Sequence, residues 1–391
     1  MGQEWRDGYR PMTRRLIEDD FAKIKAMGSN TVRRYGIAMA DHNILAAARN
    51  HGLKVLYGFW FENRVDYIND AEKLHHYQEQ IRSTVLKYKD DPSILGWSLG
   101  NEVWGLLKQR FAAPYLTEER IAYLNFIEQS ARLVHQLDPK HPVFMVSEHS
   151  WDLPGELFEA AHAVPSVDVL GINSYYDHYI SQLEHVVREY NWFRPYLVSE
   201  FGPPGYWDET YTKLNDFQVP VEPSSVEKSA SYVRQWKKYI APRRGDDVGG
   251  VAFTWRDRME ETFTWFGLSD YAGRLKPSYY ALAKAWTGRR VLPQPQLARI
   301  DGPEKVESGS VARYAISLVG GGYLSAGHEL NLKWDIRRDN VFETDATITP
   351  VENGTQATIR LPKEPGDYRL YVYLSTRSNA VDTAAVSIHV R

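Results

Sequence analysis

Short apolar runs alternate with longer segments of helical periodicity along residues 16 to 286. The runs have the length of buried strands, and the longer segments place apolar residues at helical spacing. Gly28 and Gly52 end two of the helical segments. The expected strands are residues 30–36, 54–60, 94–99, 143–146, 167–173, 195–202 and 249–255, and the expected helices are residues 16–27, 42–50, 71–88, 118–137, 156–161, 180–190, 225–240 and 278–286. The sequence therefore predicts a regular alternation of helix and strand.

This alternation favours parallel βαβ units and an α/β fold class. The length suits a (β/α)8 TIM barrel better than an open doubly wound sheet, for which no glycine-rich dinucleotide loop is present. The first barrel strand is not evident, because residues 1–15 are polar. An unclosed barrel would leave strand edges unpaired. We expect that a strand upstream of Met1 is missing from this chain, or that a segment near Trp5 to Tyr9 or another chain takes its place.

The pattern changes beyond Trp286. A proline-containing segment without helical period comes first, and short alternating apolar runs separated by Gly and Asn or Asp turns follow it. The expected strands are residues 314–319, 329–334, 346–348, 357–361, 368–374 and 384–390. We therefore predict a barrel at residues 1–288, a linker at residues 289–300 and an immunoglobulin-like β-sandwich at residues 301–391. The sandwich carries no visible constellation of chemical side chains, which favours an accessory role.

Composition and charge exclude several classes of protein. A net charge of −3 gives no basic surface for nucleic acid, and the absence of cysteine excludes a disulfide framework, a thiolate nucleophile and a Cys-ligated zinc site. No signal peptide and no run of about 18 apolar residues is present, so we expect a soluble chain without membrane insertion. A trimmed N-terminus would leave a periplasmic or secreted location open. Twelve tryptophans favour a sugar-binding cleft or a large aromatic core.

Two of the expected strands end in a glutamate. The run SILGWSLGNEV ends in Asn101 and Glu102, and the run PYLVSEFG carries Glu200 at its end. Active sites of α/β barrels lie at the carboxyl ends of the strands, so we expect the two carboxylates to form a pair. Taken singly, each glutamate is equally well explained by a salt bridge at a strand end.

These motifs resemble the retaining β-glycoside hydrolases of clan A. The nearest pattern is the catalytic barrel of glycoside hydrolase family 2, with some similarity to the family 17-like β-glucan enzymes. The resemblance covers about residues 15 to 287. It rests on SLGNE at 98–102, VSEFG at 198–202, NTVR at 30–33, NSYY at 173–176, RRYG at 33–36, Trp255 and FGLSDYAGRLKPSYYAL at 266–282. The domains that precede the barrel in family 2 are absent from this chain, so exo-acting family 2 specificities are not transferred.

The resemblance implies a role for each matching residue. Glu102 would be the general acid/base and Glu200 the nucleophile. Asn101 would bind the sugar 2-hydroxyl. Arg33 and Tyr175 would orient and stabilise the Glu200 carboxylate. Trp255 would form the floor of the subsite that holds the cleaved sugar.

Retaining hydrolysis requires these residue types independently of the family. One carboxylate must be ionised to attack the anomeric carbon, and a second must be protonated to assist the leaving oxygen. An arginine would keep Glu200 ionised, and the charge of Glu200 would raise the pKa of Glu102. Arg33 could instead form an ion pair inside the barrel, with Arg34 as the alternative if the strand register differs by one residue. Tyr175 and Trp255 could simply be core residues.

Other strand ends supply further candidates for substrate binding. Tryptophans in several loops could stack against successive sugar rings, although each could equally be packed in its loop. Glu148 is a third carboxylate that could contact substrate. The tryptophans are Trp60, Trp104, Trp151 and Trp207, in addition to Trp255. No motif for a catalytic metal is present, so we expect no metal and no other cofactor.

We therefore predict a retaining β-glycosidase or transglycosidase that acts on a β-glucan or a related β-linked oligosaccharide or polysaccharide. The alternative is a non-catalytic carbohydrate-binding protein, against which the glutamate pair argues. The sequence does not decide between hydrolysis and transglycosylation, which depends on the geometry of the acceptor site, and it gives no oligomeric state.

Overall fold

The computed structural model describes residues 12–208, 210–243, 245–290, 296–319 and 330–391. These residues fall into two compact units. The first unit comprises residues 12–201 and 235–252, and the second comprises residues 202–234 and 253–391. The segment near Trp5 to Tyr9, which could have supplied a first strand, lies outside the described residues.

The first unit is built on a parallel sheet of seven strands that follow one another in chain order. Its edge strands β1 and β7 also come into contact, so the sheet nearly closes on itself. The strands are β1 (Thr31–Arg33), β2 (Lys54–Phe59), β3 (Ile94–Leu99), β4 (Val143–Glu148), β5 (Val169–Asn173), β6 (Tyr196–Phe201) and β7 (Asp247–Ala252). The central strands are buried along almost their whole length, as expected for a parallel sheet covered on both faces.

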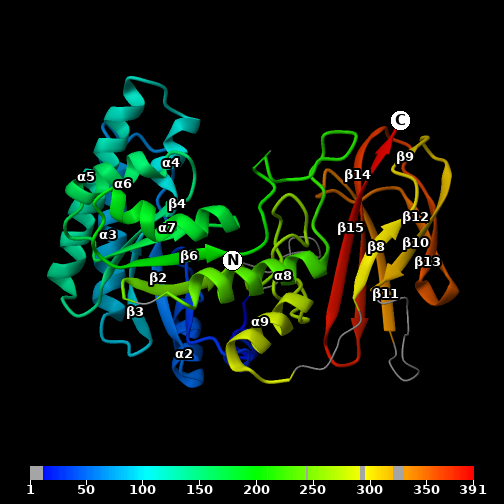
Figure 1. Ribbon diagram of the computed structural model, residues 1–391, viewed down its shortest axis with the longest axis horizontal. Coiled ribbons are helices and arrows are strands. Elements are labelled where there is room, and N and C mark those ends of the chain that lie inside the picture. The colour runs from blue at the N-terminus through cyan, green and yellow to red at the C-terminus, as the bar shows by residue number, and fades with distance from the viewer. Residues whose placement is uncertain (1–11, 209, 244, 291–295, 320–329) are drawn as a thin grey trace. The chain divides into compact units, whose positions relative to one another are not determined.

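Helices connect these strands along the chain (Figure 1). They are α1 (Arg14–Ala26), α2 (Asp41–His51), α3 (Ala71–Tyr88), α4 (Val103–Leu106), a 3₁₀ turn (Leu107–Gln109), α5 (Tyr115–Leu137), α6 (Leu153–Ala163), α7 (Asp177–Glu189), and a π-helical turn (Trp236–Ile240) that continues α8 (Ser225–Gln235). Local sequence sets several of the helix ends. The Asp70 side chain accepts a hydrogen bond from the Lys73 amide at the start of α3, and Gly52 ends α2 with a left-handed φ of 60°.

The second unit contains the helix α9 (Pro277–Thr287) and two antiparallel sheets that form a β-sandwich (Figure 1). One sheet has the order β12-β13-β10-β8 and the other the order β11-β14-β15-β9, where β9 joins β15 in parallel. The strands are β8 (Leu297–Asp301), β9 (Lys305–Val306), β10 (Val311–Leu318), β11 (Leu330–Arg338), β12 (Thr347–Val351), β13 (Gln356–Arg360), β14 (Gly366–Thr376) and β15 (Val381–Val390), with a short 3₁₀ turn at Glu352–Gly354. The predicted fold class, a TIM-type barrel followed by a β-sandwich, is confirmed.

Strand β14 is buried on both faces, which explains its unbroken apolar sequence LYVYL. Leu370 and Val372 belong to the core between the two sheets. Tyr371 and Tyr373 point the other way and pack with Phe263 in a second cluster of the same unit. Strand side chains alternate between faces, so a strand that is apolar at every position needs two apolar partners.

Three of the differences from the sequence expectations concern the candidate site or the boundary of the sandwich. The strand expected at residues 249–255 ends at Ala252, so Trp255 lies in the following loop. Strand β8 starts at Leu297, inside the segment expected to be a linker, because its amide donates to the buried Asp382 carboxylate and its chain pairs with β10. The short helix α4, directly after Glu102, was not expected.

Among the helices of the described residues, none is both long enough and apolar enough to cross a membrane.

Candidate active site

The turn after β3 presents Asn101 and Glu102 at the carboxyl end of the sheet. Gly100 and Glu102 both adopt left-handed backbone conformations, with φ values of 69° and 58°. A Cβ atom at Gly100 would lie 2.7 Å from the Tyr123 hydroxyl oxygen, so a larger residue does not fit there. For Glu102 the left-handed conformation is strained, and the turn is held by its amide, which donates to the Val146 carbonyl at 2.9 Å. The strain therefore lies at the predicted acid/base, as is common at functional sites.

Glu200 lies near the end of β6 and is only 5% exposed. Its Oε1 atom accepts hydrogen bonds from Arg33 Nη1 at 2.9 Å and from the Tyr35 hydroxyl at 2.8 Å. Its Oε2 atom accepts one from the Tyr175 hydroxyl. Three donors, one on β1 and two in separate loops, thus fix this carboxylate.

Asn173, the last residue of β5, connects Glu102 to Glu200 through Arg33. Its Nδ2 atom donates to Glu102 Oε1 at 2.8 Å and to Asn101 Oδ1 at 3.1 Å. Its Oδ1 atom accepts from Arg33 Nη1 at 3.1 Å and from Ser199 Oγ at 2.8 Å. The structure therefore brings Arg33, Asn101, Glu102, Tyr175 and Glu200 into one hydrogen-bonded network.

Arg33 also orients Asn101, because Arg33 Nη2 donates to Asn101 Oδ1 at 2.6 Å. The Asn101 oxygen is thus engaged by two donors, Arg33 and Asn173. Its amide nitrogen is then the group that Asn101 can offer to a ligand. Arg34, the alternative partner, instead pairs with Asp41 at 2.6 Å.

The environment of Glu102 makes it a proton carrier near neutral pH. Burial is the largest cause that raises the pKa of Glu102 to about 8, and the charge of Glu200 raises it further. The hydrogen bond from Asn173 acts in the opposite direction, as does the charge of Arg33. One carboxyl group is thus protonated while its partner is held by three donors, which is the division of roles that general acid catalysis requires.

Glu148 ends β4 and lies close enough to Glu102 for its charge to raise the Glu102 pKa as a smaller cause. Its Oε1 atom accepts from Ser150 Oγ at 3.1 Å and from Lys108 Nζ at 3.3 Å. The cation paired with the Glu148 carboxylate is thus Lys108. Among the described residues, no group of three or more His, Cys, Asp or Glu side chains is placed to hold a metal ion.

The tryptophans of the first unit occupy different environments. Trp104 is 3% exposed, donates from Nε1 to Glu159 at 3.2 Å and packs against the Arg120 guanidinium at 3.6 Å. Trp60 and Trp151 are 52% and 78% exposed. Lys108 Nζ lies 5.4 Å from the centre of the Trp151 ring. Trp60 and Trp151 thus expose ring surface to solvent, whereas Trp104 is packed into the protein.

Trp207 and Trp255 belong to the second unit. Trp207 is 48% exposed and stacks on Phe266 with a centroid distance of 5.7 Å. The rings of Trp255 and Tyr279 pack edge to face, with their centroids 6.1 Å apart. The Trp255 carbonyl accepts a hydrogen bond from the Ser269 amide at 2.8 Å. Roles for these tryptophans in substrate binding stay predictions.

Three residues of the network were not among the predicted site residues: Tyr35, Asn173 and Ser199. Tyr35 and Asn173 lie within the motifs RRYG and NSYY, so a signal for both was present in the sequence. Asn173 also ends an expected strand, which is the position that revealed the glutamates. Ser199 lies within the motif VSEFG, directly before Glu200.

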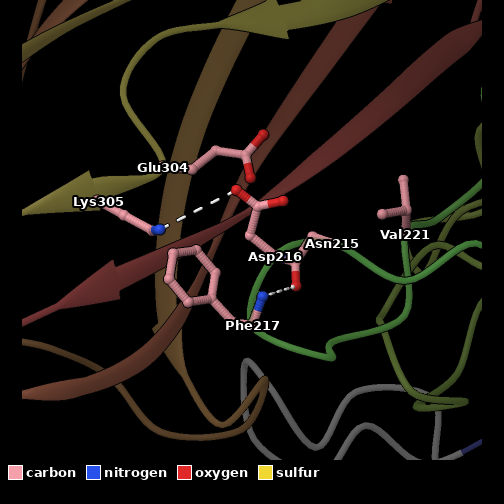
Figure 2. A pocket seen from close by; sticks show the side chains of 6 residues that line it. All are labelled: Asn215, Asp216, Phe217, Val221, Glu304 and Lys305. Atoms are coloured by element: carbon pink, nitrogen blue, oxygen red, sulfur yellow. Dashed lines mark hydrogen bonds and ion pairs between the residues drawn. The ribbon is translucent and has the colours of Figure 1, made fainter.

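Figure 2 shows a pocket of about 490 Å³ within the second unit. It is lined by Asn215, Asp216, Phe217, Val221, Glu304 and Lys305. Phe217 stacks on His389 at 4.7 Å, and Lys305 Nζ lies 4.8 Å from the same ring and 4.0 Å from the Asp216 carboxylate. The aromatic ring of this pocket is thus engaged by neighbouring protein groups.

Comparison with known proteins places these observations in a family context. The family model described as "Glycosyl hydrolases family 2, TIM barrel domain" matches residues 10–208. A β-glucuronidase of Canis lupus familiaris is 27% identical over 222 residues, which are 51% of this chain and 31% of that protein. A β-glucuronidase of Paenibacillus borealis is 26% identical over 204 residues, which are 47% of this chain and 31% of that protein. The matches thus cover about a third of the length of these curated relatives.

Solved structures are similar at the level of the fold. The crystal structure of a Bacteroides uniformis β-glucuronidase has a TM-score of 0.58 and 16% identity, and the match covers 99% of this chain and 45% of that chain. A family 2 β-galacturonidase from Eisenbergiella tayi bound to galacturonate has a TM-score of 0.55 and 16% identity, with coverage of 74% and 50%.

Proposed function

The chain belongs to glycosyl hydrolase family 2, and on this premise we propose that it hydrolyses a β-glycosidic bond with retention of configuration. The proposal rests on one observation. A buried carboxylate, Glu200, is held by three donors in the same network as Glu102, whose pKa is raised to about 8. Retaining hydrolysis needs one ionised and one protonated carboxyl group side by side.

In the proposed first step, a Glu200 oxygen attacks the anomeric carbon and forms a glycosyl ester. The bond to the leaving oxygen breaks, and that oxygen takes the proton of Glu102. In the second step, Glu102 removes a proton from water, the water oxygen attacks the anomeric carbon, and the Glu200 carboxylate is released. Two inversions give net retention.

The other residues of the network have supporting roles in this proposal. The Glu200 carboxylate is stabilised before its attack by hydrogen bonds from Arg33, Tyr35 and Tyr175. The same donors stabilise it again when it leaves the anomeric carbon in the second step. Asn101 donates from its amide nitrogen to the 2-hydroxyl of the sugar. The residues up to 288 would supply the catalytic barrel, and the sandwich, which includes β8 from Leu297, would be an accessory domain.

A β-glucuronide is the substrate class that we propose first, because the matched curated relatives are β-glucuronidases. A neutral β-glucan is the second candidate. It is favoured by the exposed rings of Trp60 and Trp151, since stacked sugar rings need such platforms. Hydrolysis is proposed over transglycosylation because the curated relatives carry names of glycosidases.

A panel of 4-nitrophenyl β-glycosides tests this proposal, with glucuronide, galacturonide, glucoside and galactoside as members and β-glucan oligosaccharides alongside. We expect turnover of at least one member, with the β-anomer as the first product detected by proton NMR. Initial release of the α-anomer would refute the retaining mechanism.

Variants locate the chemistry. Glu200→Gln should lower the rate by several orders of magnitude, because covalent catalysis is removed. Glu119→Gln is a matched control, since this buried glutamate of α5 accepts from the Tyr67 amide at 2.8 Å through an oxygen that glutamine retains. Equal loss in both variants would contradict the assignment. Binding of oligosaccharide without turnover of any substrate would favour the alternative, a non-catalytic carbohydrate-binding protein.

A further inference from the structure

Asn173 uses every hydrogen-bonding position of its side-chain amide. An asparagine amide has two N–H donors and two acceptor lone pairs. Here the donors face Glu102 and Asn101, and the acceptor faces Arg33 and Ser199. The residue is only 3% exposed, so bulk water does not reach these hydrogen-bonding positions.

The partners of Asn173 permit only one orientation of the amide. Arg33 is a pure donor, so the group that faces it must be the Asn173 oxygen. The nitrogen is then directed toward Glu102, whose Oε1 atom lies 2.8 Å away. If the amide were flipped, two N–H groups would face the Arg33 guanidinium, and the oxygen would face the oxygens of Asn101 and Glu102.

This fixed donor distinguishes the two oxygens of Glu102. An amide N–H can only donate, so Glu102 Oε1 must present a lone pair to it. The proton of the carboxylic acid therefore resides on Oε2 as long as this hydrogen bond is kept. When Glu102 is ionised, the same bond becomes charge-assisted and stronger.

We propose that Asn173 is a positioning residue that keeps the transferable proton on Glu102 Oε2 and selectively stabilises the ionised form of Glu102 that activates water. This inference rests on the proposed retaining mechanism, in which Glu102 must be an acid in the first step and a base in the second. Burial and the Glu200 charge favour the acid form, and Asn173 offsets part of that preference. Without Asn173, Glu102 would remain a competent acid and become a poorer base.

The variant Asn173→Ala tests the proposal with two aryl glycosides of the sugar that the wild type cleaves. A 2,4-dinitrophenyl glycoside needs little protonation on leaving, so its turnover reports the second step. We expect a burst of dinitrophenol followed by a steady-state rate about 10- to 100-fold below that of the wild type. Azide, which needs no base, should restore most of the lost turnover.

A phenyl glycoside needs an acid, and its kcat/KM reports the first step. Loss of a donor to the ionised form raises the pKa of Glu102, so the alkaline limb of kcat/KM should move upward by about one pH unit. Asn69→Ala is the matched control. The Asn69 side-chain amide also donates to a carboxylate, that of Asp66 at 3.1 Å, but it lies on the surface outside the network, so we expect less than about a threefold change and no pH shift.

The outcomes separate this inference from the function on which it rests. A wild type without turnover or without labelling of Glu200 by a mechanism-based inactivator would overturn the proposed function. An active wild type whose Asn173→Ala variant shows no burst, no azide rescue and an unchanged pH limb would overturn the inference alone. An equal loss in both steps would indicate a purely structural role and would also overturn it.

Discussion

Replacing Glu102 by glutamine should stabilise the protein at alkaline pH while abolishing acid catalysis. In the folded protein Glu102 keeps its proton up to about pH 8, whereas in the unfolded chain it loses that proton near the ordinary glutamate pKa of 4.5. Between these two pH values unfolding releases a proton, so the free energy of unfolding falls as the pH rises. The stabilising contribution is complete below about pH 4.5 and is lost by about pH 8.

The structure sets the size of this effect. Each pKa unit corresponds to about 1.4 kcal/mol, so the rise from 4.5 to about 8 gives an upper value of about 5 kcal/mol. The Glu102 carboxyl group is buried, but the residue as a whole keeps some exposure to solvent, and screening reduces this value to an expected change of about 2 kcal/mol. The Glu102→Gln variant still accepts the hydrogen bond of Asn173 but carries no titrating group at this position.

Thermal unfolding of the wild type and the Glu102→Gln variant at several pH values between 5 and 9 measures the effect. The difference in Tm should move in favour of the variant by about 4–8 °C across this range. Glu156, whose pKa burial also raises to about 8, is present in both proteins, and most of its contribution cancels in the difference because the charge of Glu102 is only a minor cause of its shift. The alkaline limb of the wild-type kcat/KM should fall near pH 8, because the same ionisation controls acid catalysis. A Tm difference that is constant from pH 5 to pH 9, or an alkaline limb below pH 6, would refute the reasoning.

Three further predictions follow from the site and the second unit. With an activated aryl glycoside and azide, Glu102→Ala should yield the β-glycosyl azide, whereas Glu200→Ala should yield the α-glycosyl azide because azide enters from the side that the carboxylate vacated. NMR distinguishes the two products, and the opposite pairing would reverse the assigned roles. Tyr175→Phe removes a donor to Glu200 Oε2 and should lower kcat about 10- to 100-fold, whereas Tyr35→Phe should cost less because Arg33 still donates to Oε1; equal effects on kcat at unchanged Tm would contradict this ranking. Removal of residues 296–391 should expose Phe263, which packs against Tyr371, and Ser225, which donates to Asp382, so the truncated chain should aggregate or lose thermal stability. A soluble truncated protein with wild-type Tm and full activity on polymer would contradict this expectation.

The sequence by itself determined the elements whose causes are local. Alternating apolar runs and helical periodicity placed all seven strands of the parallel sheet, because strands buried on both faces must be apolar throughout. The glutamates were found because a carboxylate directly after such a run must emerge at the carboxyl end of a barrel strand. Fold and glutamate pair could thus be predicted from short stretches of chain.

Elements that depend on distant partners could not be predicted in this way. Strand β8 follows a proline-containing segment and is defined by its pairing with β10 and by the Asp382 carboxylate, which lies far along the chain. The length of the strand before Trp255 likewise depends on its neighbour β6, with which pairing ends at Ala252. Periodicity carries no information about such pairings.

Only the tertiary structure decided how the site works. Asn173 is one asparagine among many in the sequence. Its importance arises because β1, the turn after β3 and β6 bring Arg33, Asn101, Glu102 and Ser199 around one amide. The raised pKa of Glu102 likewise results from burial and from a charge almost a hundred positions away in the chain. Residue type and spacing identify which groups can do the chemistry, whereas hydrogen-bond geometry and desolvation, which exist only in the folded chain, determine which of them carries the proton.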